Sequence, residues 1–312
     1  MEKYDRLLEE PFEFDFNENV SFAWDLMKQT KWSFLGFLLI AWIASAIVSG
    51  LSTLLSGEIV TVNIIFSLIS NLFSAVLMAG VFVYFQEGVL NQNRFDFGNF
   101  FAGFKKVVPI GLSQIAIWVM MLPAFLVLGL TVFSIDDIVT LINSPLAAQS
   151  IFQNINISQV IIGVAVVIIV AMSIGLTYCI SVPIIVNNEI GFWDAMELSR
   201  KLVWKNFGQI LWFYVATFFI VGFVGMLVGG LLMVIMIVPF LGWLIGIAGI
   251  LILGTMMMAF MYGANFGIYY QAFKPILGQD LFEEKVSSFG SSERDINTES
   301  QEDFGKPLDS FD

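Results

Sequence analysis

The sequence has no histidine and one cysteine, Cys179, which lies inside an apolar run. The absence of histidine removes the commonest general base and the commonest metal ligand, together with Ser-His-Asp and Cys-His catalysis. A single cysteine can form neither an intrachain disulfide nor a cysteine metal cluster. We therefore expect a protein that is not an enzyme and that uses no cofactor.

Charge is also scarce. Only 13% of the 312 residues are charged, against about a quarter in soluble proteins, and 58% are hydrophobic. A soluble protein of this length could not cover so large an apolar core. A bilayer removes the difficulty because it solvates apolar faces, so the composition predicts an integral membrane protein.

Six stretches reach the roughly 20 mostly apolar residues that a spanning helix needs. They are 32–55, 62–85, 107–133, 160–186, 208–238 and 241–272. The predicted fold is therefore an all-α polytopic bundle of six transmembrane helices. The last two helices, at about 45 Å, exceed a hydrocarbon layer of about 30 Å, so they must tilt, break or project. Gly229-Gly230 is a candidate break point.

The basic residues are segregated along the chain. All fourteen lysines and arginines precede the first span, follow the last, or lie between spans two and three or four and five. The positive-inside rule therefore places both termini and both basic loops in the cytoplasm.

The net charge of −12 belongs to the two ends of the chain. Residues 1–20 carry seven acids and two bases, residues 276–312 carry ten acids and three bases, and the remainder is neutral. We predict an acidic cytoplasmic segment at 1–16, a membrane domain at 17–275 and a disordered acidic tail at 276–312. Such tails avoid nucleic acid, so the expected partners are the lipid bilayer and other membrane proteins. The tail either docks a partner or only solvates the chain.

Three stretches share one plan: an amphipathic segment, a basic patch, a span out, an external loop and a span back. The amphipathic segments are 17–31, 96–106 and 192–205, and the corresponding pseudo-repeats are 17–93, 94–191 and 192–275. The pattern predicts three hairpins, each preceded by an amphipathic interfacial helix.

Polar residues recur where the returning spans reach the cytoplasm: Glu87, Glu189 and Gln271. A carboxylate at a helix C-terminus opposes the helix dipole, so each glutamate should have a cationic partner. The candidate partners are Lys105 or Lys106 for Glu87, and Arg200 or Lys201 for Glu189. These residues form either a cluster that binds a cation or a headgroup, or structural ion pairs between hairpins. We favour the ion pairs, because structural pairs perturb charges as readily as active sites do.

A second polar set lies inside the second span, at Ser67, Ser70, Asn71 and Ser74. Their spacing of i, i+3, i+4 and i+7 places them on one helix face. This face either lines a wet cavity or packs against another helix, and packing is favoured.

Glycine and proline also mark the spans. Gly225 with Gly229, and Gly242 with Gly246, have the spacing of close helix contacts. Pro123 and Pro183 lie inside spans and predict kinks.

The stretch PIIVNNEIGFWDAMELSRKLVWKN, residues 183–206, resembles a signature of bacterial multi-pass membrane proteins. These are similar to the membrane domain attached to some glycerophosphodiester phosphodiesterases. The hydrolase domain, with its histidines and acidic metal ligands, has no counterpart in this sequence, so the resemblance implies a membrane module without that activity. It also implies a bacterial inner membrane location.

Two functions are consistent with these features. We favour a non-enzymatic interaction or assembly component of a membrane complex. The alternative is a transporter or a conduit for lipid or small solutes, which the repeat, the serine-asparagine face and the kinked helices would suit.

Overall fold

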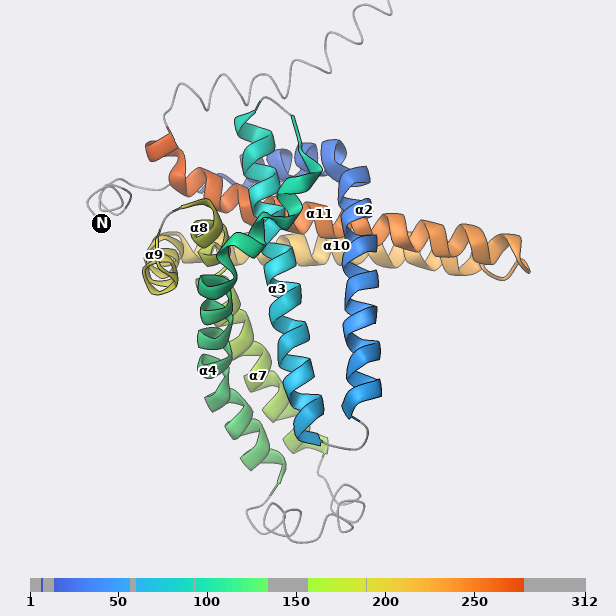
Figure 1. The fold of residues 1–312 in the computed structure, drawn as a ribbon, viewed down its shortest axis with the longest axis horizontal. Helices are drawn as coiled ribbons and strands as arrows, with labels where there is room; N and C mark the ends of the chain where they lie inside the picture. The colour runs from blue at the N-terminus through green and yellow to red at the C-terminus, as the bar shows by residue number, and fades with distance from the viewer. Residues whose placement is uncertain are drawn as a thin grey trace, which may run out of the picture. The chain divides into compact units, whose positions relative to one another are not determined.

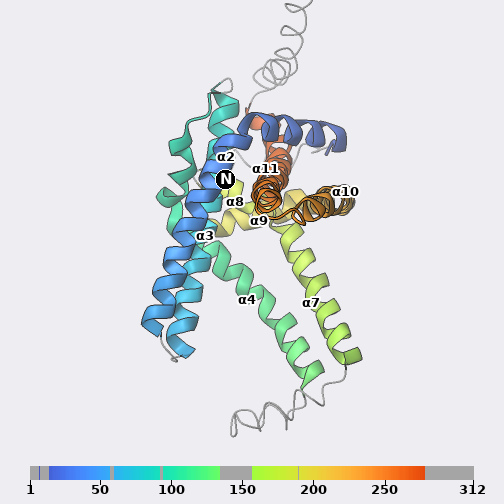
Figure 2. The ribbon, with the colours of Figure 1, turned by 90° about the vertical axis from the view of Figure 1, so that its right-hand side faces the viewer.

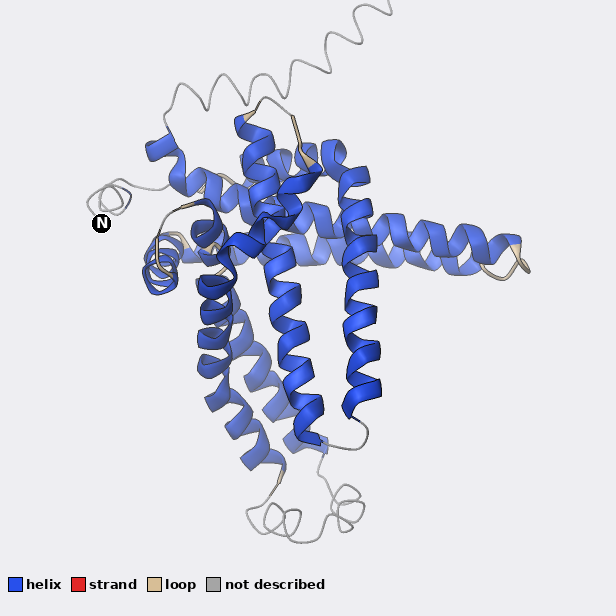
Figure 3. Cartoon of the chain, in the orientation of Figure 1, coloured by secondary structure: helices blue, strands red, loops and turns tan. Residues whose placement is uncertain are grey.

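The structure is a computed structural model that describes residues 7, 14–56, 60–91, 94–133, 157–188 and 190–277. The predicted acidic segments 1–16 and 276–312 fall almost wholly outside these residues, as does most of the loop after the third span. Every regular element in the described ranges is a helix, as predicted (Figure 3). In chain order these are α2 (Phe16–Ser56), α3 (Val60–Leu90), the 3-10 helix η1 (Phe97–Lys106), α4 (Val107–Val132), α7 (Ile157–Thr177), α8 (Ser181–Asn187), α9 (Phe192–Lys205), α10 (Phe207–Ile235) and α11 (Leu241–Leu277).

Within the described ranges, six helical stretches are long and apolar enough to cross a membrane. They are Phe16–Leu51, Ile64–Leu90, Phe97–Val132, Ile157–Asn187, Phe207–Ile235 and Leu241–Lys274. Each overlaps one of the six predicted spans. The chain is therefore a polytopic helical membrane protein.

The chain divides into two units. Unit 1 contains Met1–Leu39, Tyr84–Asn99 and Phe218–Asp312, and unit 2 contains Ile40–Val83 and Phe100–Thr217. Unit 1 thus joins the start of α2 to the end of α3, most of α10 and all of α11. Unit 2 holds α4, α7, α8 and α9 with the remaining parts of α2, α3 and α10.

In unit 1 the start of α2 packs closely on α11 (Figure 2). A Cβ built on Gly263 would lie 3.3 Å from the Ala23 Cα, and one built on Gly267 would overlap the side-chain oxygen of Asn19. Beside this crossing the ring of Phe22 stacks on Tyr270 at 5.3 Å between centroids. Small residues on both helices permit the close approach, and aromatic rings pack beside it.

The start of α2 has a buried side and an exposed side. Ala23, Leu26 and Met27 are buried, whereas Lys28 and Gln29 are exposed. The segment is helical and continuous with the span that follows it.

Helices α10 and α11 form a tight hairpin, and their parts in unit 1 run side by side (Figures 1 and 2). The turn has Phe240 at a φ of 62°, and the Leu241 N–H donates to the Pro239 carbonyl at 2.8 Å. A Cβ on Gly242 would overlap the Ile235 carbonyl, and one on Gly246 would overlap Met236. Both glycines therefore make the close contacts that their spacing predicts.

Two predictions for α10 have different outcomes. A Cβ on Gly225 would lie 2.9 Å from Met257 Cε, which fits the predicted contact, but Gly229 has open space around it. The candidate break at Gly229-Gly230 is wrong, because α10 continues to Ile235. Each glycine disfavours a helix by only about 1 kcal/mol, which is less than an unpaired backbone group costs in lipid.

In unit 2 the helix of the fourth span is interrupted just before Pro183, where the sequence predicts a kink. α7 ends at Thr177 and α8 begins at Ser181. Pro183 has no N–H, and its ring conflicts with the carbonyl four residues earlier, at Cys179, so the regular ladder cannot pass this point. The Ser199 hydroxyl of α9 donates to the Thr177 carbonyl at 2.9 Å and satisfies one of the last carbonyls of α7.

The other two segments that the sequence predicts to be amphipathic, 96–106 and 192–205, are also largely helical. In α9, Ala195, Leu198 and Leu202 form a buried face. The second segment is a 3-10 helix, η1, in which Phe100 and Gly103 are buried. A Cβ on Gly80 of α3 would overlap the Phe100 carbonyl. This contact is backbone to backbone, so no side-chain rotation can relieve it.

We therefore expect Gly80→Ala to destabilise the protein by about 1–3 kcal/mol, as overpacking usually does. The matched control is Gly222→Ala in α10, where a Cβ has open space, and alanine there should be neutral or stabilising by up to about 1 kcal/mol. Thermal unfolding in one detergent, followed by size-exclusion chromatography, measures both. Equal midpoints for the two variants would contradict the packing described.

Candidate functional site

Gln271 belongs to the predicted polar cluster. It lies in unit 1, and its side chain is buried. Its amide nitrogen donates to the Asp15 carbonyl and its amide oxygen accepts from the Asp15 N–H, both at 3.1 Å. The two bonds fasten the end of α11 to the residue that precedes α2. Here Gln271 is a structural clamp.

Two further contacts lie near this clamp. Lys274 Nζ is 3.7 Å from a carboxylate oxygen of Glu18, and the Tyr269 hydroxyl donates to Gln86 Oε1 at 3.4 Å. Glu87 follows Gln86 in the sequence, but its carboxylate accepts a hydrogen bond from the Asn91 amide at 3.0 Å. The end of α11 is therefore tied to the start of α2 and to the end of α3.

The other predicted cluster members are not brought to Gln271 by the described contacts. Glu189 lies outside the described residues, and Arg200 and Lys201 belong to unit 2. Both cations pair with Glu197: Arg200 donates to its two oxygens at 2.6 and 2.8 Å, and Lys201 Nζ lies 3.5 Å away. The cluster of Glu87, Glu189, Gln271, Arg200 and Lys201 stays a prediction.

The hydrogen bonds from Arg200, aided by the charges of Arg200 and Lys201, lower the pKa of Glu197 from 4.5 to about 2. The carboxylate therefore stays ionised throughout the neutral range. Because the pair is exposed to solvent, its effect on stability is small. The sequence contains the signal for this pairing, since Glu197 precedes Arg200 by three residues and Lys201 by four.

The serine-asparagine set lies on α3 within unit 2. Ser67 and Asn71 are exposed, and Ser70 and Ser74 are half-buried. The Asn71 amide donates to the Ser67 carbonyl at 2.8 Å, one turn earlier in the helix. Because α3 is unbroken from Val60 to Leu90, the spacing of the four residues places them on one side of this helix.

Unit 1 contains an apolar cavity of about 250 Å³ that the sequence does not reveal. Trp24 and Met27 of α2, Val224 of α10, and Met257 and Phe260 of α11 line it. This volume is close to the lower end of small-ligand pockets, roughly 300–1,000 Å³. Its lining offers almost no polar surface, so only an apolar group suits it.

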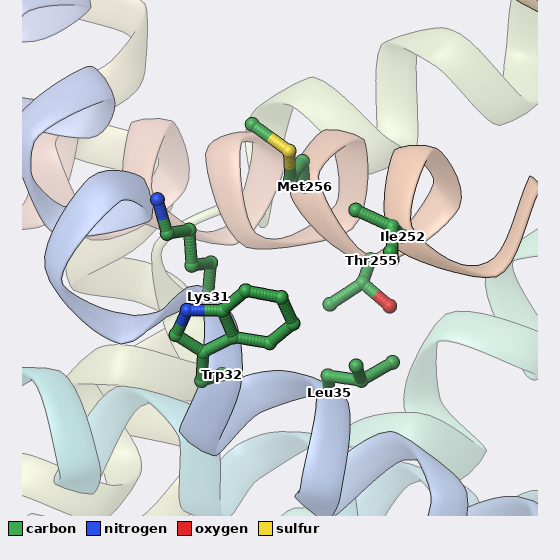
Figure 4. Close-up of a pocket in the computed structure, with 6 residues that line it drawn as sticks. All are labelled: Lys31, Trp32, Leu35, Ile252, Thr255 and Met256. Atoms are coloured by element: carbon green, nitrogen blue, oxygen red, sulfur yellow. The ribbon is translucent and has the colours of Figure 1, made fainter. Parts of the chain in front are cut away.

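A smaller hollow of about 100 Å³ lies between α2 and α11, which are two of the three helices that line the larger cavity (Figure 4). Trp32 and Leu35 of α2 face Ile252 and Thr255 of α11 across it, with Lys31 at one side. Met256 lines both this hollow and the larger cavity. The feature of the sequence that corresponds to this hollow is the Lys31-Trp32 pair at the predicted start of the first span.

No protein-family model, characterised protein or solved structure matches this chain. Within the described ranges, no three His, Cys, Asp or Glu residues lie together in a way that could hold a metal ion.

Replacing Gln271 tests the clamp. Gln271→Leu removes both hydrogen bonds to Asp15, and we expect it to destabilise the protein by about 1–3 kcal/mol. Gln29→Leu on the exposed side of α2 is the control, with an expected change within about 0.5 kcal/mol. Thermal midpoints in detergent compare the two, and a midpoint for Gln271→Leu as high as that of the control would remove the structural role.

Proposed function

We propose that the chain is a non-enzymatic integral membrane protein that takes part in the assembly of a membrane complex. The observation that carries this proposal is the polar face of α3. Ser67 and Asn71 are exposed although they lie in a helix apolar enough to cross a membrane. A polar group facing hydrocarbon without a partner is costly, so this face requires either another helix or water.

A hydrogen-bonded contact with a helix of another protein is the arrangement that best satisfies the polar groups of this face. Serine and asparagine side chains form hydrogen bonds between transmembrane helices, each contributing roughly 0.6–2 kcal/mol. Asn71 uses one amide N–H within its own helix, on the Ser67 carbonyl. An amide offers two donor hydrogens and two acceptor lone pairs, so Asn71 retains capacity for a second helix.

The segregation of the basic residues supports an orientation with both ends in the cytoplasm. The resemblance of residues 183–206 to membrane modules of bacterial proteins supports a place in a bacterial inner membrane. In the same proposal the start of α2, η1 and α9 lie at the cytoplasmic interface, where exposed Trp193 and Trp204 of α9 would meet the headgroups.

The second candidate function is a conduit for lipid or a small solute. The break between α7 and α8 favours it, because transporters often bind substrate at discontinuous spanning helices. In this case the face of α3 would line a water-filled path.

A photo-crosslinking residue in place of Asn71 separates the two functions. In native membranes we expect Asn71 to give a discrete adduct with a second membrane protein or a second copy of this chain, identified by mass spectrometry. The control position is Ile69, which is half exposed and lies on the opposite side of α3.

A matching labelling experiment uses Asn71→Cys in a Cys179→Ala background. Assembly predicts slow reaction with a charged, membrane-impermeant thiol reagent. Rapid labelling of Asn71→Cys, with no more crosslinking from position 71 than from position 69, would overturn assembly in favour of the conduit.

A further inference from the structure

The hollow beside Lys31 has an unusual combination of linings. Its walls are the apolar side chains of Leu35, Ile252 and Met256, and the Thr255 hydroxyl already donates to the Leu251 carbonyl at 2.8 Å. The other polar groups of the lining side chains are the ammonium of Lys31 and the indole N–H of Trp32. Among the residues that the structure describes, no carboxylate lies within ion-pair distance of this ammonium.

The neighbouring lysine on the same helix has a different environment. Lys28 Nζ lies 4.0 Å from an Asp25 oxygen and 5.9 Å from the centre of the Trp24 ring. The charge of Lys28 is thus partly compensated by its own helix. Lys31 sits one turn nearer to the spanning part of α2 and borders the hollow directly.

Trp32 adds a feature typical of a bilayer boundary. Its side chain is 65% exposed, yet it forms one wall of the hollow opposite Thr255 (Figure 4). Tryptophan prefers the level of the headgroups, where one end of the ring is wet and the other apolar. Lysine at that level attracts anionic headgroups and extends its ammonium toward them.

We propose that this hollow binds an anionic phospholipid, with the phosphate at Lys31 and Trp32 and an acyl chain between α2 and α11. Met256 lines both the hollow and the larger apolar cavity, so the cavity offers a second apolar surface on which an acyl chain can lie. The charge of Lys31 selects the headgroup, and the apolar walls hold the chain. This proposal does not depend on the polar face of α3. If lipid binding at the hollow is disproved, the proposed assembly function is unaffected.

The test is native mass spectrometry of the full chain, purified in detergent, stripped of lipid, and mixed with phosphatidylglycerol or phosphatidylcholine that carry identical acyl chains. We expect the protein to retain phosphatidylglycerol preferentially. Lys31→Gln should lower that retention about five-fold, the effect of one cation at a membrane surface, and should leave phosphatidylcholine unchanged. Lys28→Gln is the matched control, and its retention should stay within about two-fold of the parent protein because Asp25 and Trp24 already compensate its charge.

A second variant tests the apolar wall. Ile252→Trp should fill the hollow and lower the retention of both lipids. Each variant is compared with the parent protein after its thermal midpoint has been shown to be unchanged. If Ile252→Trp fails to fold, the two lysine variants still decide the question. Equal retention of the two lipids by the parent protein, or equal losses in Lys31→Gln and Lys28→Gln, would overturn the proposal. Displacement of the lipid by excess inorganic phosphate alone would also overturn it, because the apolar walls would then contribute nothing.

Discussion

The close approach of α2 to α11 is the constraint on which unit 1 depends. Lipid offers no hydrophobic driving force between spanning helices, so their association relies on shape and on hydrogen bonds. Ala23 lies against Gly263, and the Asn19 amide donates to the Ala264 carbonyl at 3.2 Å. A larger side chain at Gly263 or Gly267 would separate the two helices.

The other features of unit 1 follow from this crossing. It brings Asp15 beside Gln271, and Glu18 beside Lys274, at the cytoplasmic ends that we propose for the two helices. The large apolar cavity lies beside the crossing, where Trp24 and Met27 line it, and the hollow beside Lys31 follows farther along α2. Close packing at glycine and looser packing at methionine and tryptophan are thus parts of one interface.

The spans could be predicted from the sequence because each depends only on a local apolar run. The break before Pro183 and the hairpin contacts of Gly242 and Gly246 could be predicted for the same reason, since covalent geometry and residue size determine them. The expected break at Gly229-Gly230 was wrong because backbone pairing in an apolar environment outweighs the low helix propensity of glycine.

The pairing of distant segments could not be predicted in this way. Nothing local links Asp15 to Gln271, which lie 256 residues apart. The contact between Arg200 and Glu197 is different, because it depends only on their spacing within one helix turn. Cavities are equally inaccessible from sequence, because they depend on how two helices diverge.

The polar residues near the membrane therefore have two kinds of task. Asn19, Gln271 and Ser199 join helices of the chain to one another. The exposed face of α3 and the ammonium of Lys31 are proposed to act outward, the first on another protein helix and the second on lipid.

The crossing of α2 and α11 can be measured directly by a disulfide. A Cβ on Gly263 would lie 3.6 Å from the Ala23 Cβ, within the roughly 3.5–4.5 Å that disulfides span. In a Cys179→Ala background, Ala23→Cys with Gly263→Cys should lose two hydrogens on mild oxidation, as read from the intact mass. Ala23→Cys with Gly254→Cys should not, since a Cβ on Gly254 has nothing within 4 Å. Equal oxidation of the two pairs, or none in the first pair, would contradict the interface from which the rest of unit 1 is built.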